Sequence, residues 1–306
     1  MKKAGLLLLI GWMLAGAVWA RETVPLADPF ILLHDGIYYA YGTHANDGIE
    51  VYTSVDLKNW EFAGLALKKG DVWGEKWFWA PEVYRANGRF LMYYSAERHI
   101  CAAWADSPLG PFTQKEKRPM MPEEPAIDHT LFIDDDGTPR IYMDRFKDGT
   151  SWIWTAELEK DLVTIKRETF RRCFGPDQPW ELKHQRIVEG SAVLKHRGKY
   201  YLTYSGNGYP SPYYGIGYAV ADRPDGPWKK YSGNPVLQLP GDLKGVGHHA
   251  FFKDKDGALR VVFHAHFNAD KVHPRQMYIT RAGFSGDGLS VSPDYGIPEL
   301  RQNTRK

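Results

Sequence analysis

The stretch EGSAVLKHRGKYYLTYS, residues 189–205, decides the fold because its pattern occurs five times along the chain. Each copy has an apolar segment, a turn with Gly, and a second segment rich in aromatic residues. The other copies are DPFILLHDGIYYAYG (residues 28–42), WAPEVYRANGRFLMYYS (79–95), DHTLFIDDDGTPRIYM (128–143) and HHAFFKDKDGALRVVFH (248–264). Short apolar runs joined by Gly turns are typical of β-hairpins. The sequence therefore predicts five hairpins of one kind.

A third apolar segment and a further turn follow most copies, as in GIGYAVADRPDGPWKKY at residues 215–231. The copies start 51, 49, 61 and 59 residues apart. A repeat of about 40–50 residues with four strands is the size of a propeller blade. We find no stretch with helical periodicity. The sequence thus predicts an all-β, five-bladed β-propeller that forms a single domain over residues 21–306. A large β-sandwich with accidentally similar hairpins is the alternative.

The composition limits the class of partner. The 306 residues include 39 Lys and Arg against 37 Asp and Glu, and 43 residues are Trp, Tyr or Phe. A nucleic-acid binder needs a basic surplus to neutralise phosphates, and this balance argues against one. Many aromatic side chains without a charge bias suit a neutral, polar, ring-shaped partner such as a sugar, although any well-packed β protein is also aromatic. We expect a monomer.

The first twenty residues resemble a secretory signal peptide. Lys2 and Lys3 precede an uncharged apolar run over residues 4–20, and Val18-Trp19-Ala20 offers small residues at positions −3 and −1 of a cleavage site. The alternative is an N-terminal membrane anchor at the lower edge of spanning length. We expect cleavage after residue 20. The exported protein is then expected to be periplasmic or secreted and to have no further contact with the membrane.

Export permits a disulfide between Cys101 and Cys173. The two residues lie far apart in the sequence, and no local pattern predicts that they pair. Two separate buried thiols are an equal expectation.

Ionisable residues begin several of the apolar strands. In a propeller the first strand of each blade lies nearest the axis, so equivalent positions meet around one end of the central channel. Counting nine residues back from each turn Gly reaches Trp79, Asp128, Glu189 and His248, whereas Asp28 is one place off this register. Acidic side chains are rarely placed on such strands without a partner or a task. We interpret these acids as a site, the alternative being carboxylates that cap solvent-exposed strand ends.

The motifs that carry these residues resemble glycoside hydrolase family 43, over essentially the whole chain after residue 20. Its five-bladed propellers act on arabinose- and xylose-containing polysaccharides. The matching motifs occur in order, one for each repeat: Ala27-Asp28-Pro29, Trp79-Ala80-Pro81, Ile127-Asp128-His129, Glu189-Gly190-Ser191 and Gly247-His248. The related fructan-hydrolysing propellers use an Arg-Asp-Pro motif. Met143-Asp144-Arg145 has the wrong order for it.

The resemblance implies an inverting glycosidase with three acids. Asp28 is the expected general base that deprotonates water, and Glu189 the expected general acid that protonates the leaving oxygen. Asp128 is expected to lie beside Glu189, to orient it and to raise its pKa, because neighbouring like charges favour the protonated form of a carboxyl.

The resemblance also points to binding residues. Trp73 and Trp79, in a segment that holds three Trp, are expected to stack on sugar, and Arg275 to contact hydroxyls of the bound glycosyl unit. The alternatives are Trp side chains in a blade core and a surface arginine. His248 is expected over the central channel, where it can help to bind a structural Ca²⁺ ion or an ordered water. No cofactor is expected for the chemistry.

The sugar stays open at this stage. The family includes α-L-arabinofuranosidases, β-xylosidases, endo-arabinanases and exo-galactanases. Many β-xylosidases of the family carry an additional β-sandwich, for which this chain has no room. We therefore expect removal of terminal α-L-arabinofuranosyl units from plant polysaccharide or oligosaccharide. The rival class is a non-catalytic sugar-binding propeller with vestigial acids.

Overall fold

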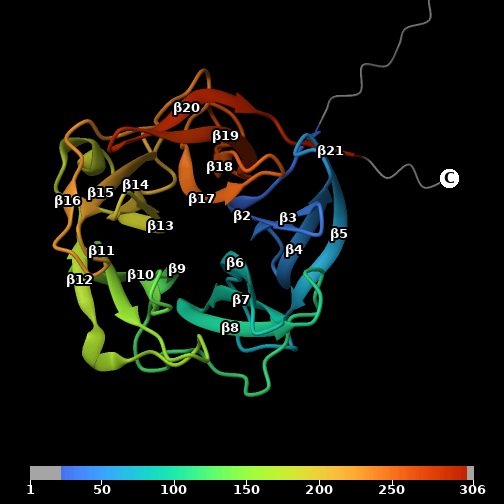
Figure 1. Ribbon diagram of the computed structural model, residues 1–306. Coiled ribbons are helices and arrows are strands. Elements are labelled where there is room, and N and C mark those ends of the chain that lie inside the picture. The colour runs from blue at the N-terminus through green and yellow to red at the C-terminus, as the bar shows by residue number, and fades with distance from the viewer. Residues whose placement is uncertain (1–21, 302–306) are drawn as a thin grey trace, which may run out of the picture.

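The computed structural model describes residues 22–301 and consists of sheets arranged radially around one axis (Figure 1). The predicted five-bladed, all-β propeller is confirmed, and each repeated hairpin forms the two inner strands of a blade. The expected signal peptide at residues 1–20 lies outside the described residues. Within residues 22–301 no helix is long and apolar enough to cross a membrane.

The blades follow one another along the chain. The first has β2 (Ala27–His34), β3 (Ile37–Thr43), β4 (Gly48–Ser54) and β5 (Asn59–Lys68). The second has β6 (Trp79–Ala86), β7 (Arg89–Ala96) and β8 (His99–Ala105). The third has β9 (Ile127–Ile133), β10 (Pro139–Lys147), β11 (Thr150–Glu157) and β12 (Arg171–Phe174). The fourth has β13 (Val188–His196), β14 (Lys199–Gly206), β15 (Gly215–Ala221) and β16 (Lys229–Lys230). The fifth has β17 (Gly247–Lys253), β18 (Leu259–Ala265), β19 (Gln276–Ser285) and β20 (Gly288–Gly296).

Two short 3-10 helices interrupt the strands of the described chain, η1 (Arg167–Thr169) and η2 (Pro179–Leu182). The two ends of that chain meet at the first blade. β1 (Glu22–Thr23) pairs with β21 (Glu299–Leu300), and β21 runs parallel to β5 at the outer edge of the blade. The backbone N–H of Glu299 donates to Lys58 at 2.7 Å. This pairing joins the last described segment to the first blade and so helps to hold the ring closed.

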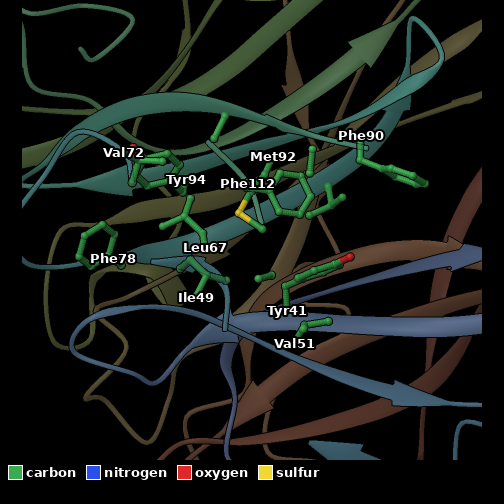
Figure 2. Close-up of a cluster of buried hydrophobic side chains, with 14 of the residues drawn as sticks. Tyr41, Ile49, Val51, Leu67, Val72, Phe78, Phe90, Met92, Tyr94 and Phe112 are labelled. Atoms are coloured by element: carbon green, nitrogen blue, oxygen red, sulfur yellow. The ribbon is translucent and has the colours of Figure 1, made fainter. Parts of the chain in front are cut away.

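The hydrophobic core is divided among the seams between neighbouring blades. The seam between the first and second blades contains Tyr41, Val51, Met92 and Tyr94, all buried (Figure 2). Comparable clusters fill the other four seams. The innermost strands also contact one another in a closed ring, β2 with β6, β6 with β9, β9 with β13, β13 with β17 and β17 with β2. The first residues of all five hairpins therefore lie close together around the axis.

Every innermost strand has a β-bulge near its start. In each blade two residues interrupt the pairing between the first and second strands, for example between Ala27 and Phe30 in β2. The first of the two has a left-handed backbone, with φ between 44° and 56°: Asp28, Ala80, Asp128, Gly190 and His248. A bulge re-aims side chains and is frequent beside active sites. Residues on either side of it therefore both reach the axis.

This bulge corrects the register inferred from the sequence. Asp28 is structurally equivalent to Asp128 and His248, whereas Trp79 and Glu189 stand one residue before the bulge. Counting from the turn Gly failed because the hairpins of the third and fifth blades are one residue longer than the others. Their turns contain Asp134-Asp135-Asp136 and Asp254-Lys255-Asp256.

Both cysteines are free thiols. Cys101 is buried in the seam between the first two blades, and Cys173 is half-buried between the third and fourth. They do not pair.

Candidate active site

A pocket of about 660 Å³ opens at the end of the axis where the innermost strands begin. This volume is within the range of small-molecule sites, roughly 300–1,000 Å³. The starts of the innermost strands contribute Asp28, Trp79, Asp128, Glu189 and His248 to its lining. Four of these five side chains are ionisable. The three acids predicted from the sequence, Asp28, Asp128 and Glu189, thus line one pocket.

Asp28 is buried among positive and polar groups. Arg275 donates from Nη1 to Asp28 Oδ1 at 2.7 Å, and its Nη2 lies 3.3 Å from Oδ2. The Nδ1 atoms of His248 and His264 each lie 3.2 Å from Oδ1. Burial alone would raise the pKa of Asp28, but Arg275 and then His248 and His264 outweigh it and hold that pKa well below its usual value. The Asp28 side chain is therefore a carboxylate.

Glu189 has the opposite protonation preference. Burial raises the pKa of Glu189 to about 7, although the hydrogen bond that Tyr214 donates to its Oε1 at 2.7 Å works against this shift. Asp128 lies beside it, with side-chain ligand atoms of Asp128, Glu189 and His248 all within 4.8 Å of one another. Burial and the charge of Glu189 raise the pKa of Asp128 well above its usual value. Because ionisation of one carboxyl disfavours ionisation of its neighbour, the pair retains a proton at neutral pH.

The rings of His264 and Tyr214 connect Asp28, which is ionised, with Glu189, whose pKa is raised. The backbone N–H of Asp28 donates to His264 Nδ1 at 3.1 Å. The His264 ring stacks on Tyr214, with ring centres 5.6 Å apart and planes 11° apart. Tyr214 in turn donates to Glu189. Gly247 permits this arrangement, because a Cβ at that position would collide with the Tyr214 ring.

His248 contacts Asp28 and lines both the pocket and the narrow channel below it. Burial lowers its pKa, so the imidazole is neutral. With Asp128 and Glu189 it forms the one group of three possible metal ligands found among residues 22–301. Calcium takes six to eight oxygen ligands. One imidazole and two carboxyls that hold a proton do not supply them, so these residues do not by themselves fit the expected Ca²⁺ ion.

The sequence-predicted binding residues are divided between the pocket and a blade seam. Trp79 lines the pocket and stacks on Trp77, with ring centres 5.5 Å apart. Arg275 also lines it, beneath the Tyr209 ring and paired with Asp28. Trp73 does not line the pocket. Its ring packs edge-on against His99 and against the core of the first seam.

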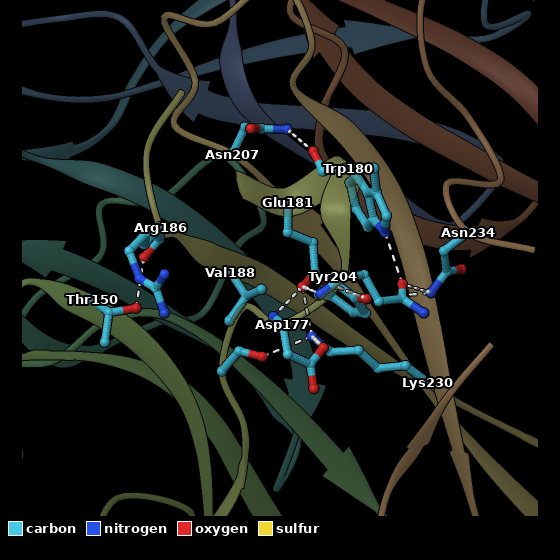
Figure 3. Close-up of polar contacts among 12 residues, drawn as sticks. Thr150, Asp177, Trp180, Glu181, Arg186, Val188, Tyr204, Asn207, Lys230 and Asn234 are labelled. Atoms are coloured by element: carbon cyan, nitrogen blue, oxygen red, sulfur yellow. Dashed lines mark hydrogen bonds and ion pairs between the residues drawn. The ribbon is translucent and has the colours of Figure 1, made fainter. Parts of the chain in front are cut away.

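A buried polar network supports the segment that leads to Glu189 (Figure 3). Glu181 in η2 is fully buried. Its Oε2 accepts a bond from Lys230 Nζ at 2.7 Å, and its Oε1 accepts one from Tyr204 at 2.6 Å. Asn207, which begins the loop to Tyr214, donates from Nδ2 to the carbonyl of Trp180 at 2.5 Å. The network therefore ties together the two segments that bring Glu189 and Tyr214 into contact.

Several pocket residues escaped sequence reasoning. Tyr209, in the loop between β14 and β15, lines the pocket, as do Lys271 and His273 in the loop between β18 and β19. Tyr214, in the same loop as Tyr209, does not line the pocket but contacts Glu189. Loops between second and third strands open at the same end of a propeller as the starts of first strands. Their unusual length in the fourth and fifth blades was the available signal. For His264 the sequence offered no signal of a functional role other than the residue type itself.

Comparisons with known proteins agree with this geometry. The family model described as Glycosyl hydrolases family 43 matches residues 23–290. A crystal structure titled endo-1,4-beta-xylanase, from Bacteroides thetaiotaomicron VPI-5482, shares 44% identity and a TM-score of 0.88, covering 92% of this chain and 100% of that one. The beta-D-galactofuranosidase xynD of Aspergillus niger is 27% identical, over 84% of this chain and 80% of its own. An arabinoxylan arabinofuranohydrolase of Paenibacillus polymyxa is 29% identical, over 78% of this chain and 44% of its own.

A propeller whose axis opens into a pocket of paired acids, matched over most of its length by one family model, defines a carbohydrate-cleaving enzyme. The chain belongs to glycoside hydrolase family 43 and is a glycosidase.

Proposed function

We propose that this protein is an exported, inverting exo-glycosidase that removes terminal α-L-arabinofuranosyl units from plant polysaccharide or oligosaccharide. The observation that carries the mechanism is the opposite protonation of two acids in one pocket. Asp28 is a carboxylate beside Arg275, whereas the pKa of Glu189 is about 7 because of its burial. Cleavage of a glycosidic bond needs one carboxylic acid to protonate the leaving oxygen and one carboxylate on the other side of the sugar, which in the proposed inverting reaction activates water.

In the proposed reaction Asp28 removes a proton from a water molecule that attacks the anomeric carbon. Glu189 gives its proton to the glycosidic oxygen as the bond to the leaving group breaks. Asp128 shares the buried proton with Glu189 and orients it. The reaction thus leaves a proton on Asp28 and a charge on Glu189, and proton exchange with solvent restores both. Each proton moves between side chains of this chain, the substrate and water.

The pocket form supports action at a chain end. It opens at one end of the propeller axis, and Tyr209 and Lys271, from the loops between β14 and β15 and between β18 and β19, form part of its wall. Named relatives include arabinoxylan arabinofuranohydrolases and an exo-α-(1→5)-L-arabinofuranosidase. These names favour a terminal arabinofuranosyl unit, carried as a side chain or at the end of a polymer.

Cleavage within or at the end of a β-1,4-xylan chain is the second candidate. The structure titled endo-1,4-beta-xylanase shares 44% identity and favours this candidate. The two candidates differ in the sugar that occupies the pocket, arabinofuranose or xylopyranose.

The test is turnover of 4-nitrophenyl α-L-arabinofuranoside, β-D-xyloside and β-D-galactoside, together with arabinoxylan and xylo-oligosaccharides. We expect arabinose release, with Glu189→Ala and Asp28→Ala each at least about a hundredfold slower on the sugar polymer, since general acid–base catalysis contributes about 10²–10⁴. Glu61→Ala, at an exposed glutamate, is the matched control.

Proton NMR of the first product gives the stereochemistry. Release of the anomer with inverted configuration is expected, and a retained anomer contradicts the assignment of Asp28 as base to water. Sugar binding without turnover of any substrate would favour the non-catalytic propeller. Export is tested separately by N-terminal sequencing of the protein recovered outside the cytoplasm, with cleavage after residue 20 expected, and by its sedimentation, with a monomer expected.

A further inference from the structure

A second hollow of about 270 Å³ adjoins the main pocket, and we call it the side pocket. Both hollows are lined by Trp79, Ile127 and Glu189, whereas Asp28 and Arg275 line the main pocket only. Glu189 thus stands at the border between the two. This placement bears on the reaction because a general acid faces the oxygen that joins the glycosyl unit to its leaving group. The assignment of the two hollows to the two parts of a substrate rests on the proposed role of Glu189 as general acid.

The positions of Asp28 and Glu189 therefore decide which hollow holds the glycosyl unit of a substrate and which holds its leaving group. The glycosyl unit must lie on the side of Asp28, which activates the attacking water. The leaving group must lie on the far side of Glu189, which is the side pocket.

Asp144 supplies an unexplained polar group in the side pocket. It lies in β10 opposite Ile127 in β9, is 3% exposed, and lines the side pocket. Its Oδ1 is buried and has no hydrogen-bond partner in the structure. A buried polar atom without a partner is destabilising by about 1–3 kcal/mol and calls for an explanation. A hydroxyl group of a bound sugar is a partner of the right chemistry.

The state of Asp144 suits that partner. Burial, and then the charges of Asp128 and Glu189, raise the pKa of Asp144 well above its usual value. The carboxyl is consequently neutral and can both donate and accept a hydrogen bond. It has no role in the proposed proton transfers.

Aromatic side chains form a large part of the remaining wall of the side pocket, beside Arg98, Ser151 and several aliphatic residues. Trp77 is 45% exposed and Phe146 is 54% exposed, unusually high values for such large apolar side chains. Trp77 stacks on Trp79, so the aromatic surface continues from the main pocket into the side pocket. Apolar rings beside polar groups such as Asp144 match the two kinds of surface that a sugar ring presents.

We propose that the side pocket binds the leaving group as a sugar residue of the polymer, with Asp144 hydrogen-bonded to one of its hydroxyls and Trp77 and Phe146 against its ring. Asp144 is then a specificity-determining residue for the leaving group. A substrate whose leaving group is a sugar uses it, and a substrate with a nitrophenyl leaving group does not.

The experiment compares kcat/KM on two substrates that share one glycosyl unit, a 4-nitrophenyl glycoside and the same unit attached to a xylo-oligosaccharide. The readout is the ratio of the two values. We expect Asp144→Leu, which keeps the branching and the number of heavy atoms but removes both polar atoms, to lower kcat/KM on the oligosaccharide at least tenfold more than on the nitrophenyl substrate. Asp144→Asn retains a donor and an acceptor and should recover most of that ratio.

Two further variants complete the test. Phe146→Ala should change the ratio in the same direction even if Asp144→Leu does not fold. Asp148→Asn is the matched control, since Asp148 is exposed in the turn after β10. An unchanged ratio in both Asp144→Leu and Phe146→Ala, with normal turnover of the nitrophenyl substrate, would overturn the side-pocket assignment and leave the proposed function intact.

Failure of the proposed function gives a different result from failure of the side-pocket assignment. If the intact protein cleaves neither substrate, binding of xylo-oligosaccharide is measured by tryptophan fluorescence, because Trp77 and Trp79 border the side pocket. Quenching that weakens at least tenfold in Asp144→Leu supports the side pocket as a sugar site. Equal quenching in both proteins contradicts it.

Discussion

The guanidinium of Arg275 lies 2.7 Å from the carboxylate of Asp28, although 247 residues separate them in the sequence. The pair joins the fifth blade to the first, across the point where the propeller closes. It also fixes the charge of the proposed base. Closure of the ring and the chemistry of the site therefore depend on the same contact.

Replacing Arg275 by Ala should raise the pKa of Asp28, because burial would then act without its main opposing charge. The activity of a carboxylate base is present above its pKa and is lost as pH falls through it. The acidic limb of the kcat/KM–pH profile should therefore move to higher pH, and the protein should also lose about 3–5 kcal/mol of stability because a buried pair is broken. Arg281→Ala, at an exposed position in β19, should leave the profile in place. An unmoved acidic limb in Arg275→Ala would contradict the argument.

Tyr214→Phe should move the alkaline limb of the same profile. The Tyr214 hydroxyl stabilises ionised Glu189, so its removal should raise the pKa of Glu189 above about 7. Activity that needs protonated Glu189 is lost as pH rises through that pKa, and the loss should begin about one unit higher, as expected for a hydrogen bond to a charged group. The neighbouring Tyr213 is exposed, and Tyr213→Phe is the control. A shift to lower pH is the contrary result.

Glu82→Gln should make stability less dependent on pH. Burial raises the pKa of Glu82 to about 8, although Tyr84 donates a hydrogen bond to it. Between about pH 4.5 and 8 the folded protein holds a proton that the unfolded chain releases, so the free energy of unfolding falls as pH rises through this window. Gln holds no such proton. The Tm difference between Glu82→Gln and the wild type should grow in favour of the variant from pH 5 to 8, and Glu61→Gln should show a constant difference. A constant difference for Glu82→Gln would count against this pKa.

Lys230→Met should destabilise the fold by about 3–5 kcal/mol, because it leaves Glu181 buried without its positive partner. Urea unfolding measures the loss. Lys229→Met, at the exposed neighbour in β16, should be nearly neutral. The double variant Glu181→Gln/Lys230→Met should recover part of the stability. Additive losses in the double variant would show that the two side chains do not act as a pair.

Removal of divalent cations by a chelator should leave kcat/KM within about twofold of the untreated value. The reason is that the carboxyl groups which could hold a cation belong to Asp128 and Glu189, and general acid–base catalysis needs the proton that these two side chains share. Loss of activity that added Ca²⁺ restores would instead place a metal ion in the site. Unfolding temperature measured in parallel separates a structural ion from a catalytic one.

Much of the fold could be read from the chain because a propeller is built by repetition. Each hairpin has its own apolar strands and Gly turn. The five copies therefore predict the five blades, and they also predict the end of the axis where the first residues of the hairpins meet. The acids were recognised for the same reason, since Asp128 and Glu189 start two of these strands.

The register at the axis could not be read in this way. The bulges at Asp28 and Asp128 leave no sign in the composition of the strands, and an extra residue in the turns before Gly137 and Gly257 shifted the count. Trp73 shows the same difficulty for side chains, because a Trp-rich segment does not say which ring faces a pocket and which fills a seam.

The sequence by itself determined the all-β repeat, the number of blades and the residue types at the axis, because these follow from local hydrophobic pattern and turn chemistry. Only the tertiary structure decided which acid is charged. The pKa of a carboxyl depends on burial and on neighbours that the chain brings from far away, Arg275 and His264 for Asp28, Tyr214 for Glu189. It likewise decided that Asp144 lines a second hollow, since residues of the second, third and fourth blades form that hollow only when the blades are assembled.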